Sequence, residues 1–467
     1  MSAAHQVSVL QPVLLSAVAA RLESEGMLLQ SHVGDVMLSG ISDDSREATA
    51  GDLFCAWKGN AIDAHDMLGS VAEAGAAAAI VERLTDAAIP QLLVRDGRRA
   101  AASAAELIYG EPRDALALAG VTGTNGKTTT VWMLRHLLSA TAPAASIGTL
   151  GAILENGELL PGSESLTTPG PVQLARTLRV FVDRGVKAVA MEVSSHALDQ
   201  GRVSSLRFDV AVFTNLTRDH LDYHGTLETY LAAKRSLIRL LRANGCAVIN
   251  ADDAAWTGLA GEAPRALTFG IAPDADVRCE GLRMGGFGSE FTLRTHDSAV
   301  TVTLPLLGDF NVHNALGAAT ACIALGHSPA DVGRSLNNLP QVPGRLERIA
   351  DTPCPVLRDY AHTPDALERV LTTLRSLTDG RTIVVFGAGG DRDKGKRPQM
   401  GAIAQQGADI AIVTSDNPRT EDPDSIIDDI VAGMTSGYER ITDRRRAIAH
   451  ALSIAGPDDI VLLAGKG

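Results

Sequence analysis

The sequence has few of the features that mark a disulfide-stabilised or zinc-stapled protein. Its five cysteines are odd in number, far apart and never spaced as Cys-x-x-Cys: Cys55, Cys246, Cys279, Cys322 and Cys354. This pattern excludes a disulfide framework and a structural zinc site, and it is typical of a reducing compartment. We therefore expect a cytoplasmic protein.

Long apolar runs are also lacking. No stretch of about 20 residues is apolar enough to span a bilayer. Residues 7–20 are mildly apolar, but no Lys/Arg-rich start precedes them and polar residues interrupt them. This favours an ordinary first helix over a signal peptide, and we expect no membrane insertion.

An excess of basic residues is missing as well. The 42 Lys and Arg against 55 Asp and Glu give a net charge of −13, which argues against a protein that coats nucleic acid through bulk charge. With 45% hydrophobic and 21% charged residues, the composition is that of a folded protein. An acidic chain can still bind anions through local basic groups or backbone N–H groups.

Length and turn signals together predict three α/β domains. A chain of 467 residues is long enough for about three domains. The turn at Tyr109-Gly110-Glu111-Pro112 and the proline-rich segment Leu339-Pro340-Gln341-Val342-Pro343-Gly344 interrupt the pattern. We therefore expect domains over residues 1–113, 114–338 and 339–467.

Between these turns, apolar runs alternate with helical segments. This alternation predicts mostly parallel sheets with both faces covered. The expected helices include residues 69–81 and 128–138, and the expected strands are residues 115–121, 186–193, 209–215, 246–250, 382–386, 409–414 and 460–464.

A glycine-rich loop follows the first central strand and opens a helix. It reads Gly123-Thr124-Asn125-Gly126-Lys127-Thr128-Thr129. Its glycines let successive N–H groups face a phosphate, Lys127 can reach the β- and γ-phosphates, and the Thr128 hydroxyl can bind Mg²⁺. The strict GxxxxGK[ST] spacing needs glycine at position 121, where this chain has Val121. The loop is therefore a variant of that pattern, and it predicts nucleotide binding.

Acidic and histidine residues follow the next two strands. Glu192 begins Glu192-Val193-Ser194-Ser195-His196, and His220 lies in the loop after residues 209–215. Ligands bind at the carboxyl ends of strands in open α/β sheets, so Glu192 and His220 are candidate Mg²⁺ ligands. The loop that holds His220 also contains three weaker candidates: Asp219, Asp222 and His224. His196, which follows Glu192, fits a structural role as well as a functional one.

Taken together, these segments resemble the Mur ligases, which add amino acids to the nucleotide-linked peptide precursor of the bacterial cell wall. Besides the loop and the two strand ends, the resemblance rests on Asp44-Ser45-Arg46, Gly51-Asp52-Leu53-Phe54, Gly308-Asp309-Phe310-Asn311, Gly344-Arg345-Leu346-Glu347 and Asp359-Tyr360-Ala361-His362. The segments occur in the family's order over nearly the whole chain. The chain is most similar to the members that add the third residue of the stem peptide.

The resemblance implies an N-terminal uridine-nucleotide domain, a central ATPase and a C-terminal Rossmann-like domain. It implies that ATP phosphorylates a substrate carboxylate and that an amine then attacks the acyl phosphate to form an amide. It also implies Mg²⁺ held by Glu192, His220 and a carbamate on Lys234; from the residues alone, Lys234 reads as a surface lysine of a helix. We expect a monomer.

The resemblance also assigns binding roles. It implies that Ser45 contacts the uridine nucleotide, and that the muramyl-dipeptide part is held by Thr167, Thr168, Ser195, Gln200 and Arg202. Without it, Thr167-Thr168-Pro169 is a turn signal and Arg202 a surface charge. It implies ATP contacts at Asn311, Arg345 and Asp359, the last two reaching across from the C-terminal domain, so that domain closure excludes water from the acyl phosphate.

Two further strand-end loops indicate which amino acid is added. One carries Arg392, and the other reads Asp416-Asn417-Pro418-Arg419. Two arginines facing one site favour a ligand with carboxylates, because the guanidinium fork binds carboxylates bidentately. Meso-diaminopimelate has a carboxylate at its far end, where lysine has a bare ammonium. The resemblance agrees, and it adds Gly465 as a diaminopimelate contact; the implied substrates are UDP-MurNAc-L-Ala-D-Glu, meso-diaminopimelate and ATP.

One departure and three alternatives stay open. The family continues with His-Glu and a further helix where this sequence stops, at Gly465-Lys466-Gly467, and we expect a chain that truly ended there to bind diaminopimelate poorly. A folate polyglutamylating ligase shares the central domain but should lack the uridine domain and the Asp416–Arg419 loop. A non-catalytic binding protein on the same fold, or a small-molecule kinase, would be distinguished by ATP turnover and by its dependence on an amine.

Overall fold

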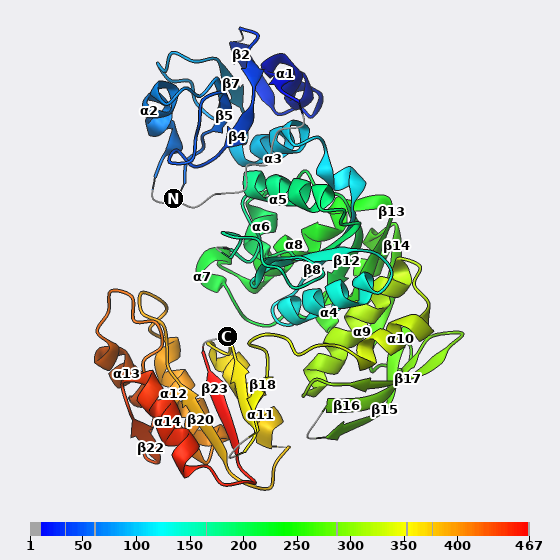
Figure 1. The fold of residues 1–467 in the computed structure, drawn as a ribbon, viewed down its shortest axis with the longest axis vertical. Helices are drawn as coiled ribbons and strands as arrows, with labels where there is room; N and C mark the ends of the chain where they lie inside the picture. The colour runs from blue at the N-terminus through cyan, green and yellow to red at the C-terminus, as the bar shows by residue number, and fades with distance from the viewer. Residues whose placement is uncertain are drawn as a thin grey trace. The chain divides into compact units, whose positions relative to one another are not determined.

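The computed structural model describes residues 11–32, 34–59, 62–164, 166–285, 288–351, 354–375 and 377–465. Contacts divide the chain into two compact units (Figure 1). The first comprises Met1–Cys279, Leu293–Val300 and His313–Ser335, and the second comprises Glu280–Thr292, Thr301–Val312 and Leu336–Gly467. Lys466 and Gly467, on which one sequence expectation falls, lie outside the described residues.

The first unit begins with a five-stranded sheet. Its order is β2 (Leu28–His32), β7 (Gln91–Val94), β6 (Ala78–Val81), β5 (Asp52–Cys55) and β4 (Gly40–Ser42), and only β2 pairs antiparallel. The short strands β1 (Val13–Leu14) and β3 (Met37–Leu38) pair separately. The helices are α1 (Leu15–Ser24), η1 (Ala64–Met67), α2 (Leu68–Glu73) and α3 (Gly97–Ile108).

The predicted helix over residues 69–81 is wrong in its second half. Helix α2 ends at Glu73, and Gly75 follows in the left-handed region with φ of 97°. Residues 78–81 form β6, in which all four side chains are buried between two parallel neighbours. The run of alanines favours a helix locally, but burial of both faces in the sheet overrides that preference.

The central sheet carries the predicted strands. Its order runs β10 (Gly151–Ile153), β9 (Ala144–Gly148), β11 (Ala188–Glu192), β8 (Ala117–Thr122), β12 (Phe208–Phe213), β13 (Leu241–Asn250) and β14 (Arg265–Gly270), and continues through β15 (Val277–Gly285), β16 (Gly288–Arg294) and β17 (Ala299–Leu304). Pairing from β9 to β14 is parallel, and β10 is antiparallel to β9. The mostly parallel α/β architecture is confirmed.

Helices cover this sheet and connect its strands. They are η2 (Pro112–Ala115), α4 (Lys127–Ser139), α5 (Pro171–Asp183), α6 (Ser195–Asp199), α7 (Leu221–His224), α8 (Leu227–Arg235), η3 (Ser236–Leu240), η4 (Ala254–Trp256), η5 (Leu259–Glu262), α9 (Asp309–Ala324) and α10 (Pro329–Asn337). The predicted helix over 128–138 is thus confirmed as α4. Helix α4 packs on β9 and β11, and α5 packs on α3 of the N-terminal part.

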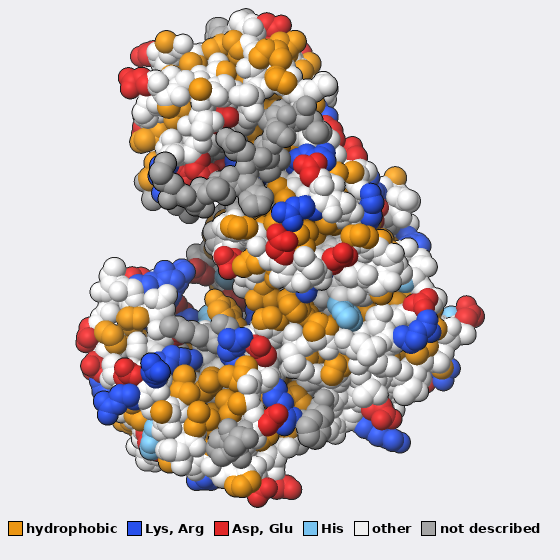
Figure 2. Space-filling view, in the orientation of Figure 1, with side chains coloured by type: hydrophobic (Ala, Val, Ile, Leu, Met, Phe, Trp, Pro, Cys, Tyr) orange, Lys and Arg blue, Asp and Glu red, His pale blue; other side chains and the backbone are white. Residues whose placement is uncertain are grey.

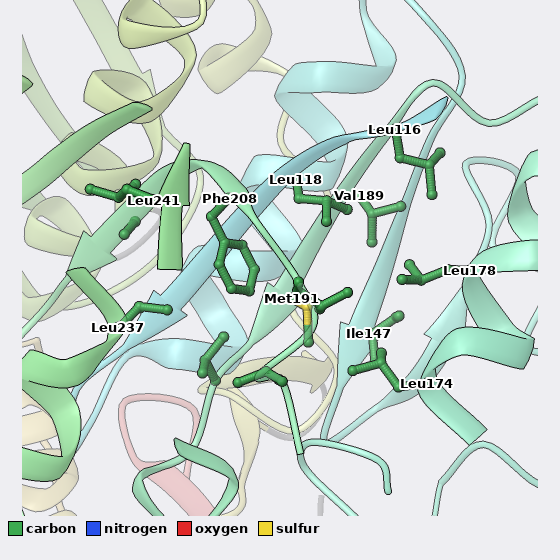
Figure 3. Close-up of a cluster of buried hydrophobic side chains, with 14 of the residues drawn as sticks. Leu116, Leu118, Ile147, Leu174, Leu178, Val189, Met191, Phe208, Leu237 and Leu241 are labelled. Carbon is green, nitrogen blue, oxygen red and sulfur yellow. The ribbon is translucent and has the colours of Figure 1, made fainter. Parts of the chain in front are cut away.

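A hydrophobic core holds the carboxyl ends of the central strands in place. Figure 3 shows Ile147 of β9 close to Leu174 and Leu178 of α5, and Leu118 of β8 beside Val189 of β11 in the same cluster as Met191. These side chains are at most 2% exposed. Since burying one such side chain contributes about 1.5–3 kcal/mol, the strand ends that carry the polar residues rest on a rigid base.

The second unit contains a six-stranded sheet. Its order is β18 (Glu347–Ala350), β19 (Val356–Asp359), β23 (Ile460–Ala464), β20 (Thr382–Phe386), β21 (Ile410–Val413) and β22 (Tyr438–Arg440), all parallel except β18. Its helices are α11 (Pro364–Arg375), α12 (Lys396–Gly407), α13 (Pro423–Val431) and α14 (Arg444–Ile454). The strands predicted over 382–386, 409–414 and 460–464 are confirmed.

The charged side chains are mixed on the surface, and the cysteines are unpaired, as the composition predicts. On the face that Figure 2 shows, basic and acidic side chains lie among one another on both units. All five cysteines are buried and free. Within the part of the chain that the structure describes, no helix combines the length and the apolar character needed to cross a membrane.

Candidate functional site

The nucleotide loop connects β8 to α4, and its backbone path requires glycine at two positions. Gly123 and Gly126 have φ of 151° and 83°. A Cβ at Gly123 would lie 1.9 Å from Thr214 Oγ1, and one at Gly126 would lie 2.2 Å from Asn314 Oδ1. Gly126 is also the N-cap of α4, so no side chain stands between the first helical turn and an anion. The loop therefore presents backbone N–H groups and a helix N-terminus as an anion site.

The segment after β12 fixes this loop. Asn125 N–H donates to Asn215 Oδ1 at 2.9 Å, and Thr124 N–H donates to Asn215 O at 2.8 Å. Thr214 Oγ1 donates to Asn125 O at 2.7 Å, and Thr217 N–H donates to Thr124 Oγ1 at 2.9 Å. No role was assigned to Thr214, Asn215 and Thr217 from the sequence, although their position directly after a strand is the signal that marked Glu192.

Two lysines converge on one carbonyl oxygen of the loop. Lys127 Nζ donates to Gly123 O at 2.9 Å and to Thr124 O at 2.8 Å, and Lys234 Nζ donates to Gly123 O at 2.7 Å. Lys234 is 1% exposed, and burial, followed by the charge of Lys127, holds its pKa well below the ordinary value. Its Nζ also lies 4.4 Å from the centre of the Tyr230 ring. The shift makes the neutral amine, which is the form that reacts with CO₂, more accessible at Lys234 than at an ordinary lysine.

Glu192 ends β11 with its carboxylate 1% exposed. Thr149 N–H donates to Glu192 Oε1 at 2.8 Å, and a Cβ at Gly148 would lie 2.3 Å from the same oxygen. The second carboxylate oxygen accepts no hydrogen bond from any described residue. A carboxylate on a buried residue, with acceptor capacity left on one oxygen, is suited to a cation.

A magnesium ion bound beside nucleotide phosphates at these residues stays a prediction. Such an ion takes few protein ligands and keeps several waters. Across the described residues, no group of three His, Cys, Asp or Glu side chains is placed to hold a metal. The ligands expected from the sequence include only two such side chains, Glu192 and His220. The other two expected ligands are the hydroxyl oxygen of Thr128 and an oxygen of a carbamate on Lys234. His220 itself has a left-handed backbone with φ of 52°, and its ring nitrogen lies 3.4 Å from Asp219.

A cluster of aromatic rings adjoins these residues. The His196 ring centre lies 4.8 Å from that of His220, 4.2 Å from Tyr223 and 5.5 Å from His224. Burial, together with the neighbouring His220 and His224, lowers the pKa of His196 to about 4. His224 Nε2 lies 3.0 Å from Ser195 Oγ. The cluster therefore carries neutral imidazoles at pH 7, and His224 connects it to Ser195.

The structure joins most of the residues predicted to hold the dipeptide. Arg202 donates from Nη1 to Thr168 O at 2.9 Å and from Nη2 to Gln200 Oε1 at 2.6 Å. Thr168 Oγ1 donates to Glu192 O at 2.9 Å. Thr167 Oγ1 lies 3.2 Å from the hydroxyl of Thr149, the residue whose N–H donates to Glu192.

Ser45 lies apart from this network. It is in the turn after β4, and no hydrogen bond links it to the residues of the dipeptide network within the described chain. Its expected contact with the uridine nucleotide stays a prediction.

The three residues expected to contact ATP from outside the loop belong to the second unit. Asp359 ends β19 and accepts hydrogen bonds from Leu346 N–H at 2.7 Å and Ala361 N–H at 2.8 Å. Burial raises its pKa, although the charge of Arg345 opposes that shift. The Arg345 guanidinium lies 5.3 Å from the Tyr360 ring centre, and Asn311 Nδ2 donates to Leu307 O. Their roles toward ATP stay predictions.

The two loops expected to bind the amino acid lie together at the carboxyl edge of the second sheet. Gly390 N–H donates to Asn417 O at 2.8 Å, and a Cβ at Gly390 would lie 1.9 Å from Pro418 O. A Cβ at Gly465 would lie 3.1 Å from Asp416 Oδ2, so the end of β23 joins the same edge.

Arg392 and Arg419 project from these two loops. Both side chains are exposed, and neither guanidinium forms a hydrogen bond or an ion pair with any described residue. Two unpaired cations on adjoining loops are suited to a ligand with carboxylates.

The parallel sheets, the glycine loop and the strand-end polar residues define the class of a nucleotide-dependent α/β enzyme. Comparison with known families makes this specific. The Mur ligase middle domain matches residues 121–322, and the Mur ligase, glutamate ligase domain matches residues 344–467. The chain belongs to the Mur ligase family, which confirms the resemblance found in the sequence.

Individual relatives agree with this assignment. The chain is 43% identical over 443 residues to a UDP-N-acetylmuramoyl-L-alanyl-D-glutamate--2,6-diaminopimelate ligase of Bacillus licheniformis, covering 93% of this chain and 90% of the relative. A solved structure of a ligase of the same name is 33% identical with a TM-score of 0.71, covering 98% of this chain and 94% of that one. A folylpolyglutamate synthase of Mycobacterium tuberculosis is 20% identical with a TM-score of 0.66, covering 79% of this chain and 92% of that one, and shares only the fold.

Proposed function

We propose that this protein is an ATP-dependent ligase that joins meso-diaminopimelate to UDP-MurNAc-L-Ala-D-Glu in the synthesis of peptidoglycan precursors. The observation that carries the proposal is the 43% identity, over 93% of the chain, to a ligase named for these two substrates. The unpaired Arg392 and Arg419 support diaminopimelate over lysine, because they can bind the carboxylate that lysine lacks at its far end.

In the first step, the glutamyl carboxylate of the nucleotide substrate attacks the γ-phosphorus of ATP, giving an acyl phosphate and ADP. The loop N–H groups and Lys127 hold the phosphates and offset their charge, which is the main requirement of phosphoryl transfer. When bound, Mg²⁺ would neutralise part of this charge, held by Thr128, Glu192, His220 and a carbamate on Lys234. The lowered pKa of Lys234 supports carbamylation, because only its neutral amine can add CO₂.

In the second step, an amine of diaminopimelate attacks the acyl carbon. A tetrahedral intermediate forms, phosphate leaves with the electron pair of the broken C–O bond, and the amine loses a proton as the amide appears. Arg392 and Arg419 orient the attacking amino acid through its carboxylates, with Gly465 and the Asp416-Asn417-Pro418 backbone beside them. Orientation of this kind lowers the barrier by placing the reacting atoms in contact.

The remaining roles belong to the same proposal. The dipeptide part is held by Thr167, Thr168, Ser195, Gln200 and Arg202, and the uridine part by Ser45. ATP is bound by Gly123, Thr124, Asn125, Gly126, Lys127, Thr128, Thr129, Asn311, Arg345 and Asp359. The domain boundaries after residues 113 and 338, a monomeric state and a cytoplasmic location are proposed with them; the free buried cysteines support the last.

Phosphate release tests the proposal directly. The protein is mixed with ATP, Mg²⁺ and UDP-MurNAc-L-Ala-D-Glu, and meso-diaminopimelate or L-lysine is added in parallel. We expect release only with diaminopimelate. Release with lysine alone would overturn the amino-acid assignment and keep the ligase, and silence with both amino acids would overturn the proposed reaction.

A further inference from the structure

Arg397 is a fully buried arginine at the start of α12. Its side chain is 0% exposed, and a buried guanidinium is stable only when it is paired. It donates from Nη1 to Glu421 Oε2 at 3.0 Å and to Asp429 Oδ2 at 2.8 Å. It donates from Nη2 to Glu421 Oε1 at 2.8 Å and to Gly389 O at 3.2 Å. Arg397 thus ties the loop after β20 to the loop after β21.

Glu421 is the junction of this network. Besides Arg397, its carboxylate accepts a hydrogen bond from Asp391 N–H at 2.5 Å and lies 3.1 Å from Lys394 Nζ. The hydrogen bonds from Arg397 are the largest cause that keeps the pKa of Glu421 far below its ordinary value. The Glu421 carboxylate, in the loop after β21, therefore holds the loop after β20 at Asp391 and Lys394 and the start of α12 at Arg397.

The fixed residues are the immediate neighbours of the two unpaired arginines. Asp391, beside Arg392, has φ of 53°, and Arg419 has φ of 52°. Left-handed backbone at residues other than glycine persists only where surrounding contacts hold it. Those contacts are present, since Thr420 Oγ1 donates to Asp391 Oδ1 at 2.7 Å and Glu421 accepts from Asp391 N–H.

From this arrangement we propose that Arg397, acting through Glu421, is a positioning residue that sets the spacing of Arg392 and Arg419 and thereby selects the amino-acid substrate. The inference rests on the proposed function, in which these two arginines bind the carboxylates of diaminopimelate. Because the Arg397 side chain is 0% exposed, Arg397 can act on a substrate only through other residues. A displacement of about 1 Å in a binding group can change a rate by about 100-fold, so the spacing of the two guanidinium groups determines selectivity.

The test measures KM for each substrate in Arg397→Met and Glu421→Gln. Arg381→Met is the matched control: Arg381 pairs with the buried Asp459 at 2.6 Å in the same unit, but directly before β20, at the opposite edge of the sheet. We expect KM for meso-diaminopimelate to rise about 10- to 100-fold in both test variants. KM for ATP and for the nucleotide substrate should stay within about twofold, and the preference for diaminopimelate over lysine should fall about tenfold.

A purely structural role would give another result. If all three KM values rise together, or if Arg381→Met loses selectivity equally, the inference is overturned. Since removing one partner of a buried charge pair can prevent folding, Thr420→Val serves as a milder variant that removes only the hydroxyl bonded to Asp391. It should keep the melting temperature and still raise KM for diaminopimelate several-fold; an unchanged KM would contradict the inference.

Failure of the proposed function would look different. In that case the unaltered protein itself shows no turnover that depends on diaminopimelate. Normal turnover in the unaltered protein, with unchanged KM values in Arg397→Met and Glu421→Gln, would reject the positioning role alone.

Discussion

Lys127 and Lys234 donate to the same acceptor, the carbonyl oxygen of Gly123, at 2.9 and 2.7 Å. Two ammonium groups this close repel each other, and the buried one gives up its charge more easily. The direction of the pKa shift at Lys234 agrees with this, since burial and Lys127 both lower it. This pairing supports the proposal that Lys127 stays charged to hold phosphates while Lys234 loses its proton more readily and can add CO₂.

The first prediction concerns the stability of the protein against pH. Because the folded-state pKa of Lys234 lies well below its unfolded value, the unfolded chain binds more protons than the folded one at pH values between the two. The free energy of unfolding therefore rises with pH, up to the unfolded pKa near 10.5. In CO₂-free buffer, we expect Lys234→Met to be more stable than the unaltered protein at pH 7, with a difference that shrinks towards pH 10.

Thermal unfolding across this pH range measures the effect, with the exposed Lys187→Met as control. A constant difference between Lys234→Met and the unaltered protein would contradict the shifted pKa. Added bicarbonate should raise the ligase turnover of the CO₂-depleted unaltered protein and leave Lys234→Met inactive.

The second prediction separates backbone strain from contact at the nucleotide loop. Gly126 and Gly185 have φ of 83° and 80°, but only at Gly126 would a Cβ meet another atom, Asn314 Oδ1 at 2.2 Å. Alanine at either position should lower the free energy of unfolding by about 1–2 kcal/mol. Only Gly126→Ala should weaken ATP binding, by more than about tenfold, since it displaces the first turn of α4. Titration with ATP and chemical unfolding of both variants check this; equal ATP affinities would contradict the role given to the loop.

Sequence patterns predicted much of this site because buried parallel strands read as apolar runs and their carboxyl ends face one edge. Glu192 was found in this way at the end of β11, whereas Asp359, at the end of β19, was assigned by the family resemblance. Patterns could not reveal that Asn215 holds Asn125, or that Arg397 holds Glu421. Each pair depends on which strands become neighbours in the sheet, and the local spacing of residues in the sequence does not determine that.

The same limit explains the error over residues 69–81. A run of alanines has the local preference of a helix, and only the place of Ala78–Val81 between two parallel strands makes it a strand. Roles such as a carbamate on Lys234 came from resemblance alone, because a lysine in a helical pattern carries no sign of its burial.

The third prediction concerns the choice of amino acid. Arg419 is exposed and unpaired among the described residues, so its removal should leave the fold intact. A charge-assisted hydrogen bond contributes about 1.5–3 kcal/mol, and we therefore expect Arg419→Gln to raise KM for diaminopimelate about 10- to 100-fold. Steady-state kinetics with each substrate varied in turn measure this. Arg445→Gln, at another exposed arginine of the same unit, should leave every KM unchanged; a loss in that variant too would point to a general effect of surface charge.

The fourth prediction follows from His196 in its cluster of rings. Its folded-state pKa of about 4 lies below the unfolded value of 6.5, because burial of the ring and then the charges of His220, His224 and Arg202 lower it, while Asp222 opposes them. Between these pH values the unfolded chain holds a proton that the folded chain lacks, so the free energy of unfolding falls as pH drops from 6.5 to 4.

We expect His196→Gln to lose less stability over this range than the unaltered protein. The difference should be on the order of 1 kcal/mol, because solvent screens a partly exposed ring. His296→Gln is the control, since the His296 side chain is 96% exposed, and it should follow the unaltered protein. Parallel curves for His196→Gln and the unaltered protein in urea unfolding from pH 7 to 4 would mean that the ring is protonated in the folded state as readily as in the unfolded one.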